Sequence, residues 1–280
     1  MHSRPQPNLG KWFITIFIIF PLLITQLYPL LWLLLYSLKN NDEILSGGIF
    51  SLPSYPRWEN YVIAIQNGHY LQYLFNSLIV TFSSIMILLF FASSVSYVLS
   101  RFRFRFSQHI FLLFLAGMML PMQSALLPLN LMFKNLHLLD TRWSLIFTYS
   151  AFAMPISVLI LTNFMRSIPR ELEEAAIIDG AGPIRLFTSI IFPISRPAMM
   201  TVSILAFISA WNEYIIAATF ISSKSLKTLP FGAYSFVSQY AVNYGAIGAY
   251  LILAALPMIL IYVFLSEWIM RGMLEGAVKG

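Results

Sequence analysis

Glu213 is an acidic side chain well inside an otherwise apolar run of the chain, and Asn212 directly precedes it. A carboxylate surrounded by lipid is energetically costly, so its presence favours a functional interpretation. Two interpretations stay open: the two side chains bond to a neighbouring helix, or they line the path of a solute. Gln123 and Asn130 lie near prolines in another apolar run and are candidates for the same path.

Charged residues gather in a second place, residues 167–197, between two long apolar runs. Seven of these residues are charged: Arg170, Glu171, Glu173, Glu174, Asp179, Arg185 and Arg196. Ser167 and Pro169 are suited to an N-cap and a first-turn proline, and the acidic residues follow where the helix dipole favours negative charge. Gly180 is typical of a helix end. The stretch therefore predicts a short helix outside the lipid, followed by a glycine turn.

A second short helix is predicted to begin at Pro183, and the prolines within 192–197 are expected to end it. One face of the first helix is small, because four residues recur at helical spacing: Leu172, Ala175, Ala176 and Asp179. A small face permits close approach of a partner. The residues alone leave two alternatives, a docking surface for a partner and an amphipathic hairpin lying on lipid headgroups.

Sequence motifs of common catalytic sites are absent. The chain has no G-x-x-x-x-G-K-[ST] phosphate loop, no H-E-x-x-H and no G-x-S-x-G. It has no cysteine, which excludes disulfides, a thiol nucleophile and cysteine-ligated zinc, and its four histidines are dispersed. We therefore expect no catalytic residue, no metal site and no cofactor bound by this chain, and any use of ATP requires a partner.

The composition is that of an integral membrane protein. Of the 280 residues, 59% are hydrophobic and 10% are charged, against roughly 25% charged in soluble domains. The net charge of +6 does not indicate nucleic-acid binding, because the basic residues are scattered at the ends of apolar runs. A lipid bilayer is therefore the expected surrounding.

Six apolar runs are long enough to cross a bilayer, which needs about 20 residues per helix. They predict an all-α protein with spans at about 12–37, 74–99, 106–133, 143–165, 198–221 and 245–270, together forming one membrane domain over 12–270. The remaining segments are a tail over 1–11, the polar loop 167–197 and a tail over 271–280. A cleaved signal peptide is the alternative for the first run, which is longer than such peptides usually are.

The distribution of lysine and arginine predicts the orientation in the membrane. Six spans place both termini on one side, and that side carries 11 of the 17 basic residues, against 6 on the other. Basic residues favour the cytoplasmic side. We therefore expect both termini and residues 167–197 to be cytoplasmic.

Residues 174–193 resemble the E-A-A-x3-G-x9-I-x-L-P signature of permease subunits of ATP-binding-cassette importers. The match is carried by Glu174, Ala175, Ala176, Gly180, Ile190 and Pro193, with Phe192 in place of the usual leucine. Further segments look like the maltose-permease G-type subunit of the carbohydrate-uptake branch: FNSLIVT at 75–81, RFRFR at 101–105, MMLPMQSALLPL at 118–129, AWNEY at 210–214 and GAVKG at 276–280. One departure is Arg57 after Pro56, where relatives commonly have threonine.

This resemblance implies a type I importer permease fold in a prokaryotic cytoplasmic membrane. It also implies partners: a homologous second permease subunit, two cytoplasmic ATPase subunits that bind ATP and magnesium, and an extracytoplasmic sugar-binding protein. Residues 167–197 would be the coupling helix that transmits ATPase closure. The residues implied to contact the ATPase are Glu171, Glu174, Ala175, Ala176, Asp179, Gly180, Ile190 and Pro193, together with Glu275, Gly276, Lys279 and Gly280 at the C-terminal end.

Other functions are alternatives to a sugar importer. An ion-coupled secondary transporter would need ionisable groups near the midplane of the membrane, whereas Glu213 is isolated and is expected in the outer half, and no inverted repeat is evident. An importer permease for another solute, such as glycerol phosphate, would share the coupling loop. In the maltose system the other permease subunit chiefly forms the sugar site, so this chain is expected to supply walls and gates.

Overall fold

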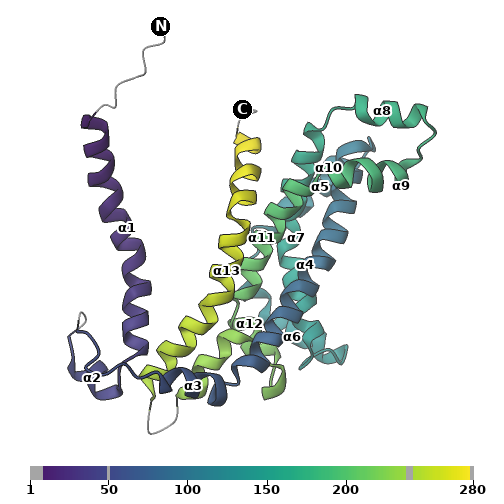
Figure 1. The fold of residues 1–280 in the computed structure, drawn as a ribbon. Coiled ribbons are helices and arrows are strands. Elements are labelled where there is room, and N and C mark those ends of the chain that lie inside the picture. Colours follow the sequence, from purple (N-terminus) through teal and green to yellow (C-terminus); the bar gives the residue numbers. More distant parts are fainter. Residues whose placement is uncertain (1–8, 49–50, 238–241, 278–280) are drawn as a thin grey trace. The chain divides into compact units, whose positions relative to one another are not determined.

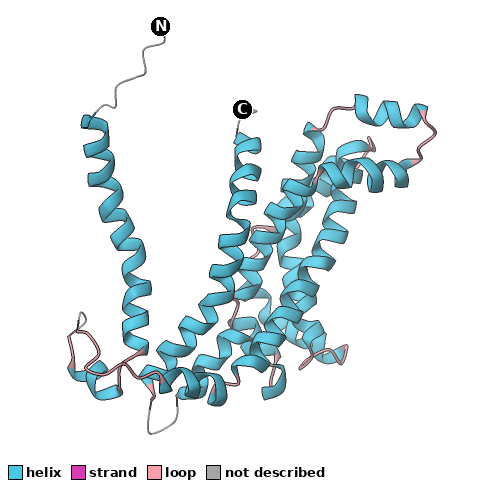
Figure 2. Ribbon diagram, viewed as in Figure 1, coloured by secondary structure: helices cyan, strands magenta, loops and turns pink. Residues whose placement is uncertain are grey.

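The computed structural model describes the backbone of residues 9–48, 51–237 and 242–277, which is helical over most of its length (Figures 1 and 2). The predicted all-helical fold is confirmed. The chain divides into two compact units. The first comprises residues 1–69 and 233–253, and the second comprises residues 70–232 and 254–280.

The first unit is built around the end of its longest helix. Its elements are α1 (Leu9–Ser37), α2 (Asn41–Ser46), α3 (Glu59–Asn67) and the first turns of α13 (Tyr244–Ala277). The side chain of Asn60 in α3 donates hydrogen bonds to the carbonyls of Ser37 and Lys39, at 2.8 and 3.0 Å. Gly245 of α13 lies against the same place, where a Cβ atom would come within 2.5 Å of the Lys39 oxygen. A glycine is therefore required for this close approach.

The second unit contains the remaining helices. In chain order they are α4 (Tyr70–Arg101), α5 (Ser107–Gly117), η1 (Met122–Ala125), α6 (Leu126–Asn135), α7 (Arg142–Ser167), α8 (Glu171–Ile178), α9 (Pro183–Leu186), the π turn η2 (Phe187–Ile191), α10 (Phe192–Ile194), α11 (Arg196–Trp211), α12 (Ile215–Phe220), η3 (Lys224–Leu226), the start of η4 (Leu229–Phe236) and the rest of α13. The core of the unit is the contact of α4 with α7, and α11 packs against both.

Small hydroxyl side chains allow α4 and α7 to pack closely. The hydroxyl of Ser150 on α7 donates to the Ser84 carbonyl on α4 at 3.0 Å, and that of Ser96 on α4 donates to the Val158 carbonyl on α7 at 3.3 Å. All these serines are buried. Small polar residues are typical of helix contacts in membranes, where close backbone approach and interhelical hydrogen bonds replace the hydrophobic effect as the driving force.

Four helices are long and apolar enough to cross a membrane: α1 from Ile16 onward, α4, α7 and α13 up to Val263. Two further pairs of helices pass the same test but are bent, by 93° between α5 and the η1–α6 segment and by 70° between 183–194 and α11. If each bent pair is one span, the total within the described residues is six.

The apolar runs 106–133 and 198–221 are not single straight helices. The first run is interrupted between α5 and η1, where Pro121 has an extended backbone and has no N–H to continue the helix. The second run is interrupted at residues 212–214, and a separate helix, α12, begins at Ile215.

Candidate functional site

The hairpin of α8 and α9 projects from the end of the second unit where α4 and α7 finish (Figure 1). We call this the loop end, and we call residues 168–197 the coupling loop. No residue of α8 is fully buried, although the side chain of Glu173 is only 13% exposed. Several large apolar side chains are exposed on the hairpin, among them Ile177, Ile178 and Ile184, which are 56%, 86% and 80% exposed. Such an exposed apolar patch on a short helix indicates a surface for a partner.

Gly180 shapes the turn between α8 and α9. Its φ of +81° lies in the left-handed region, which favours glycine. The Gly180 N–H donates to the Ile177 carbonyl and the Ala181 N–H to the Ala176 carbonyl, both at 2.9 Å. This pair of bonds is the Schellman motif that ends many helices. The predicted glycine turn and the predicted second helix, which begins at Pro183, are both present.

The predicted beginning of the first helix is wrong. Ser167 is the last residue of α7, and its hydroxyl donates back to the Phe164 carbonyl at 2.8 Å, so it does not cap the following helix. Ile168 has an extended backbone, as expected for a residue before proline. Pro169 consequently lies in the connection between the two helices, and α8 begins at Glu171.

The predicted end of the second helix, within residues 192–197, is confirmed. The helical path that begins at Pro183 runs through α9, η2 and α10 to Ile194, and the chain bends by 70° into α11 at Ser195. The helix widens into a π turn just before Pro193. This widening accommodates a proline, which lacks the N–H of a regular helical bond.

An ion pair attaches α8 to the end of α4. The Nε of Arg101 lies 2.6 Å from Oε1 of Glu173, and the two side chains are only 6% and 13% exposed. The same guanidinium donates through Nη2 to the Ile168 carbonyl at 3.2 Å. Arg101 therefore connects three segments: the last turn of α4, the end of α7 and the first turn of α8.

A second attachment lies beside α9. The Tyr97 hydroxyl of α4 donates to the Pro183 carbonyl at 3.1 Å, and its ring lies 5.0 Å from that of Phe187. Tyr97 also belongs to a buried apolar cluster with Met165, Ile168 and Ile191. The coupling loop is thus fixed at both of its helices to the two helices that form the core of the unit.

The residues predicted to contact an ATPase fall into two groups. Five of them lie on the outer surface of the hairpin and are exposed: Glu171, Glu174, Ala175, Asp179 and Gly180. Ala176 is half-buried on the same helix. Ile190 and Pro193 are also half-buried, and Ile190 packs against the apolar cluster around Tyr97. The geometry assigns these last two to the base of the hairpin, which holds the exposed group in position.

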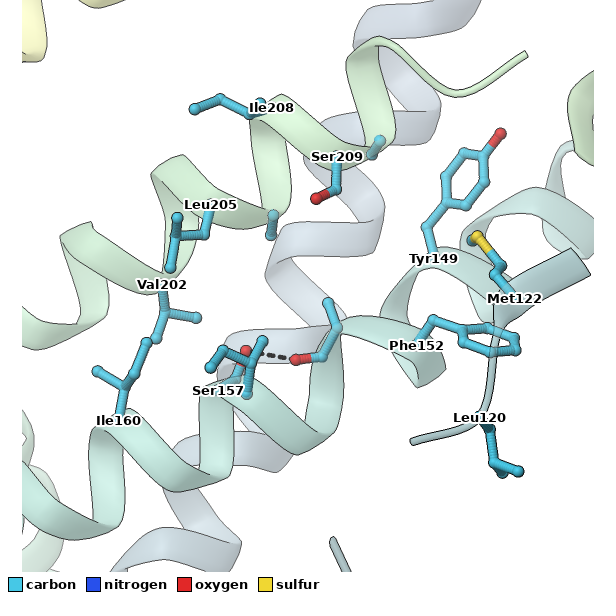
Figure 3. Close-up of a pocket in the computed structure, with 14 residues that line it drawn as sticks. Leu120, Met122, Tyr149, Phe152, Ser157, Ile160, Val202, Leu205, Ile208 and Ser209 are labelled. Atoms are coloured by element: carbon cyan, nitrogen blue, oxygen red, sulfur yellow. Dashed lines mark hydrogen bonds between the residues drawn. The ribbon is translucent and has the colours of Figure 1, made fainter. Parts of the chain in front are cut away.

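An apolar groove of about 450 Å³ lies between α7 and α11 (Figure 3). Leu205 and Ile208 of α11 are on one side of it, and Phe152 and Ile160 of α7 are on the other, with Leu120 approaching from the break before η1. The few polar groups include Ser157, whose hydroxyl donates to the Ala153 carbonyl at 2.7 Å. The groove presents few groups for hydrogen bonding a polar solute.

The carboxylate of Glu213 forms hydrogen bonds with a neighbouring helix, which is one of the two interpretations that the sequence left open. It accepts a hydrogen bond from the Tyr149 hydroxyl of α7 at 2.7 Å. It also accepts from the backbone N–H groups of Ile216 and Ala217 at 2.8 and 3.1 Å, and so caps the first turn of α12. Its carboxylate connects α7 to the break between α11 and α12 and does not line the groove.

The other predicted path residues do not line the groove either. Asn212 is exposed, and its side chain donates to the Ile208 carbonyl of its own helix at 2.9 Å. Gln123 is exposed in η1, and Asn130 is half-buried in α6. The four side chains are thus not brought together around this cavity, and a role for them in a solute path stays a prediction.

The segment after α12 is tightly held at the opposite end of the unit. Asp140 accepts hydrogen bonds from the hydroxyl and N–H of Ser223 and from the N–H of Ser222, at 2.5, 2.9 and 2.9 Å. These bonds hold the pKa of its carboxyl below the ordinary value. Asn76 of α4 donates to the carbonyls of Ser225 and Lys227, at 2.8 and 2.9 Å. This connection therefore has a fixed shape.

The C-terminal contact predicted for the ATPase falls partly outside the described residues. Lys279 and Gly280 lie beyond them, as does most of the predicted N-terminal tail. Glu275 and Gly276 lie in the last turn of α13, which continues as a helix to Ala277. Their contact with an ATPase stays a prediction.

Two residues that attach the hairpin were not predicted in that role. Arg101 contributed to the orientation and to the RFRFR resemblance, and Glu173 was not among the predicted contacts, although the two form the ion pair that attaches α8. Their opposite charges on the same side of the membrane were a usable signal. Tyr97 carried no such signal, because its bond goes to a backbone carbonyl.

Comparisons with known proteins agree on one family. Residues 1–275 match the model of the family described as "Binding-protein-dependent transport system inner membrane component". The chain is 39% identical to a putative ABC transporter permease protein of Caldicellulosiruptor sp. strain Rt8B.4, over 90% of this chain and 91% of that protein. It is 36% identical to a diacetylchitobiose uptake system permease protein of Streptomyces coelicolor, over 90% and 83%.

The fold is also found in a solved structure. A chain of a bacterial ABC transporter that imports the acidic polysaccharide alginate superposes with a TM-score of 0.78. The match covers 95% of this chain and 98% of that one, at 22% sequence identity. At this identity the likeness concerns the fold alone.

Proposed function

Because the chain belongs to the family of inner membrane components of binding-protein-dependent transport systems, we propose that it is a permease subunit of an ATP-driven sugar importer. The sugar class is supported by the relative that takes up diacetylchitobiose, which is similar over nine-tenths of this chain. In this role the chain forms one half of a path across the cytoplasmic membrane and itself hydrolyses no ATP.

The exposed hairpin of α8 and α9 is the proposed contact with a cytoplasmic ATPase subunit. The observation that carries this assignment is the combination of an unburied helix with two attachments to the core, Arg101 to Glu173 and Tyr97 to Pro183. A surface that a partner moves must be exposed, and it must also be joined to the helices that are to follow the movement. Both requirements are met in the coupling loop.

The same proposal sets the remaining partners and the orientation. A homologous second permease subunit completes the path, two ATPase subunits bind ATP and magnesium, and an extracytoplasmic sugar-binding protein delivers the solute. The loop end carries seven arginines in positions 101–196: Arg101, Arg103, Arg105, Arg166, Arg170, Arg185 and Arg196. This excess of basic residues supports a cytoplasmic location for the loop end.

The groove between α7 and α11 is proposed to form the wall of the path on this subunit. Its lining is mainly apolar, and exposed Leu205 and Ile208 stand at its edge. An apolar wall of this kind guides a sugar without holding it tightly, and the second permease subunit then supplies most of the hydrogen bonds to the solute.

An ion-coupled mechanism is the second candidate function, and the geometry of Glu213 speaks against it. A proton- or sodium-binding carboxylate must be free to exchange its ion, whereas this one accepts three hydrogen bonds from α7 and α12. These bonds hold the side chain in one position between the two helices.

Cysteine cross-linking tests the docking of the hairpin. The chain has no cysteine, so an Ala175→Cys variant carries a single thiol on the exposed face of α8. We expect it to cross-link to a cysteine in the ATPase subunit when the importer is assembled in membranes, and the yield should change on addition of ATP. Thr219→Cys, exposed on α12 at the opposite end, is the matched control and should give no such product. Equal yields from both positions would refute the docking surface.

A further inference from the structure

A hollow with basic walls lies at the loop end, next to the start of the coupling loop, which contributes Arg170 to its lining. Its volume is about 790 Å³, and it is formed where α4 ends, α5 begins and α7 ends. Four arginines line it: Arg103, Arg105, Arg166 and Arg170. They come from two stretches of the chain that are about 60 residues apart, so the folding of the unit, and not a local charge run, brings them together.

Within the described part of the chain, no ion pair neutralises the arginines of this hollow. Among the described residues the one ion pair joins Arg101 to Glu173, and none of the four arginines of the hollow takes part in it. Arg105 and Arg166 instead lie over aromatic rings, at 5.7 Å from that of Phe106 and 5.2 Å from that of Phe111. All four side chains are exposed. Several guanidinium groups without carboxylate partners attract an anion, and phosphate matches their geometry.

The N-terminus of α5 adds to the positive electrostatic potential of the hollow. The first turn of α5 contributes Ser107 and Gln108 to the lining, and no side chain caps this helix. Uncapped N–H groups at a helix start carry a partial positive charge. In this 11-residue helix that charge acts in addition to the four arginines and does not stand alone.

The surroundings of the hollow indicate which phosphate compound it would take. Phe104, Phe111 and Leu112 line it together with the arginines, and α5 leads away from it with further exposed apolar side chains such as Leu113. Inorganic phosphate would make no favourable contact with these apolar side chains. A phospholipid would contact both parts of the hollow, because its headgroup lies at the level of the basic side chains while its acyl chains need an apolar surface.

We propose that this hollow binds the headgroup of an anionic phospholipid, with the arginines on its phosphate and the acyl chains along the apolar face of α5. The site would hold a lipid of the same leaflet as the coupling loop. It does not depend on which solute is transported.

Lipid binding to the assembled, purified transporter tests this proposal. Native mass spectrometry would measure the affinity for dioleoylphosphatidylglycerol, with dioleoylphosphatidylcholine as the neutral lipid. The test variant is Arg103→Gln with Arg166→Gln. The control variant is Arg185→Gln with Arg196→Gln, which removes two exposed arginines of the loop end that do not line the hollow. Arg103→Lys with Arg166→Lys keeps the charge and provides a variant for which normal insertion is expected.

Each arginine near an anionic lipid contributes about fivefold in affinity. The test variant should therefore bind phosphatidylglycerol about 30-fold more weakly, while the control variant binds as the unaltered protein does and the lysine variant lies between. Binding of phosphatidylcholine should not distinguish the variants.

Three results would overturn the proposal. In the first, both glutamine variants lose the same affinity, which makes the effect one of total charge. In the second, millimolar inorganic phosphate displaces the lipid from the complex, so the site is one for free phosphate. In the third, the test variant keeps its lipid but releases the ATPase subunit, which would assign the hollow to an acidic protein surface.

Discussion

A Gly180→Val variant is expected to lose about nine-tenths of ATP-driven uptake while its insertion into the membrane stays normal. Gly180 has a φ of +81°, and the turn that it forms carries the two bonds that end α8. A side chain in this region costs about 1–2 kcal/mol, and β-branched valine adapts poorly. A Cβ atom would meet nothing within 4 Å, so the effect comes from the backbone and not from a clash. The turn must change shape, and α8 then leaves the position in which it docks.

Gly182→Val is the matched control for this experiment. Gly182 is exposed, a Cβ atom there also meets nothing within 4 Å, and its φ of −78° with ψ of 170° suits valine. Uptake into vesicles that contain the complete importer should be near normal for this variant. The ATPase subunit that co-purifies with each variant provides a second measurement. Equal uptake by the two variants would contradict the assigned role of the Gly180 turn.

The second large loss of uptake is expected when the charge of Arg101 or of Glu173 is reversed. Arg101→Glu and Glu173→Arg should each reduce coupled uptake by about a hundredfold, because removing one partner of a well-buried pair costs about 3 kcal/mol. The pair qualifies, since the side chains are 6% and 13% exposed with 2.6 Å between Nε and Oε1. In each single variant two like charges meet where α8 joins α4, and the hairpin is displaced.

The double variant distinguishes positioning from a general loss of structure. Arg101→Glu combined with Glu173→Arg restores opposite charges and should recover most of the uptake and most of the Ala175→Cys cross-linking to the ATPase. Lys134→Glu is the control, because Lys134 is exposed near the end of α6, lies outside the coupling loop and forms no ion pair in the described structure. If the double variant stayed as inactive as the single ones, the pair would not be the attachment that we assign to it.

Local signals in the sequence were sufficient for much of the fold. The cores of α4 and α7 follow from apolar runs of membrane length, and both ends of the glycine turn follow from residue type, because Gly180 alone tolerates its φ and Pro183 suits a first turn. Ser167 shows where such signals mislead. Its hydroxyl served the helix that precedes it, and a serine between two helices carries no information on which of the two it caps.

Features that depend on tertiary contact were not predictable in the same way. Pro121 interrupts the third apolar run, but the bend of 93° depends on what packs around it. Glu213 was placed inside a straight span, whereas the chain breaks there and its carboxylate caps α12. Arg101 and Glu173 are far apart in sequence, so only the folded unit shows that they meet. The exposed part of the coupling loop could be predicted from local sequence. Its attachments to α4 could not, because they depend on tertiary contacts.

Uptake by the purified components tests the central claim most directly. Liposomes would contain this chain with its second permease and ATPase subunits, loaded with ATP, and would receive the sugar-binding protein and labelled oligosaccharide outside, with no ion gradient. We predict accumulation of the sugar that stops when ATP, the ATPase subunit or the binding protein is omitted. Accumulation by this chain without any ATPase subunit, driven by an imposed proton or sodium gradient, would contradict the account.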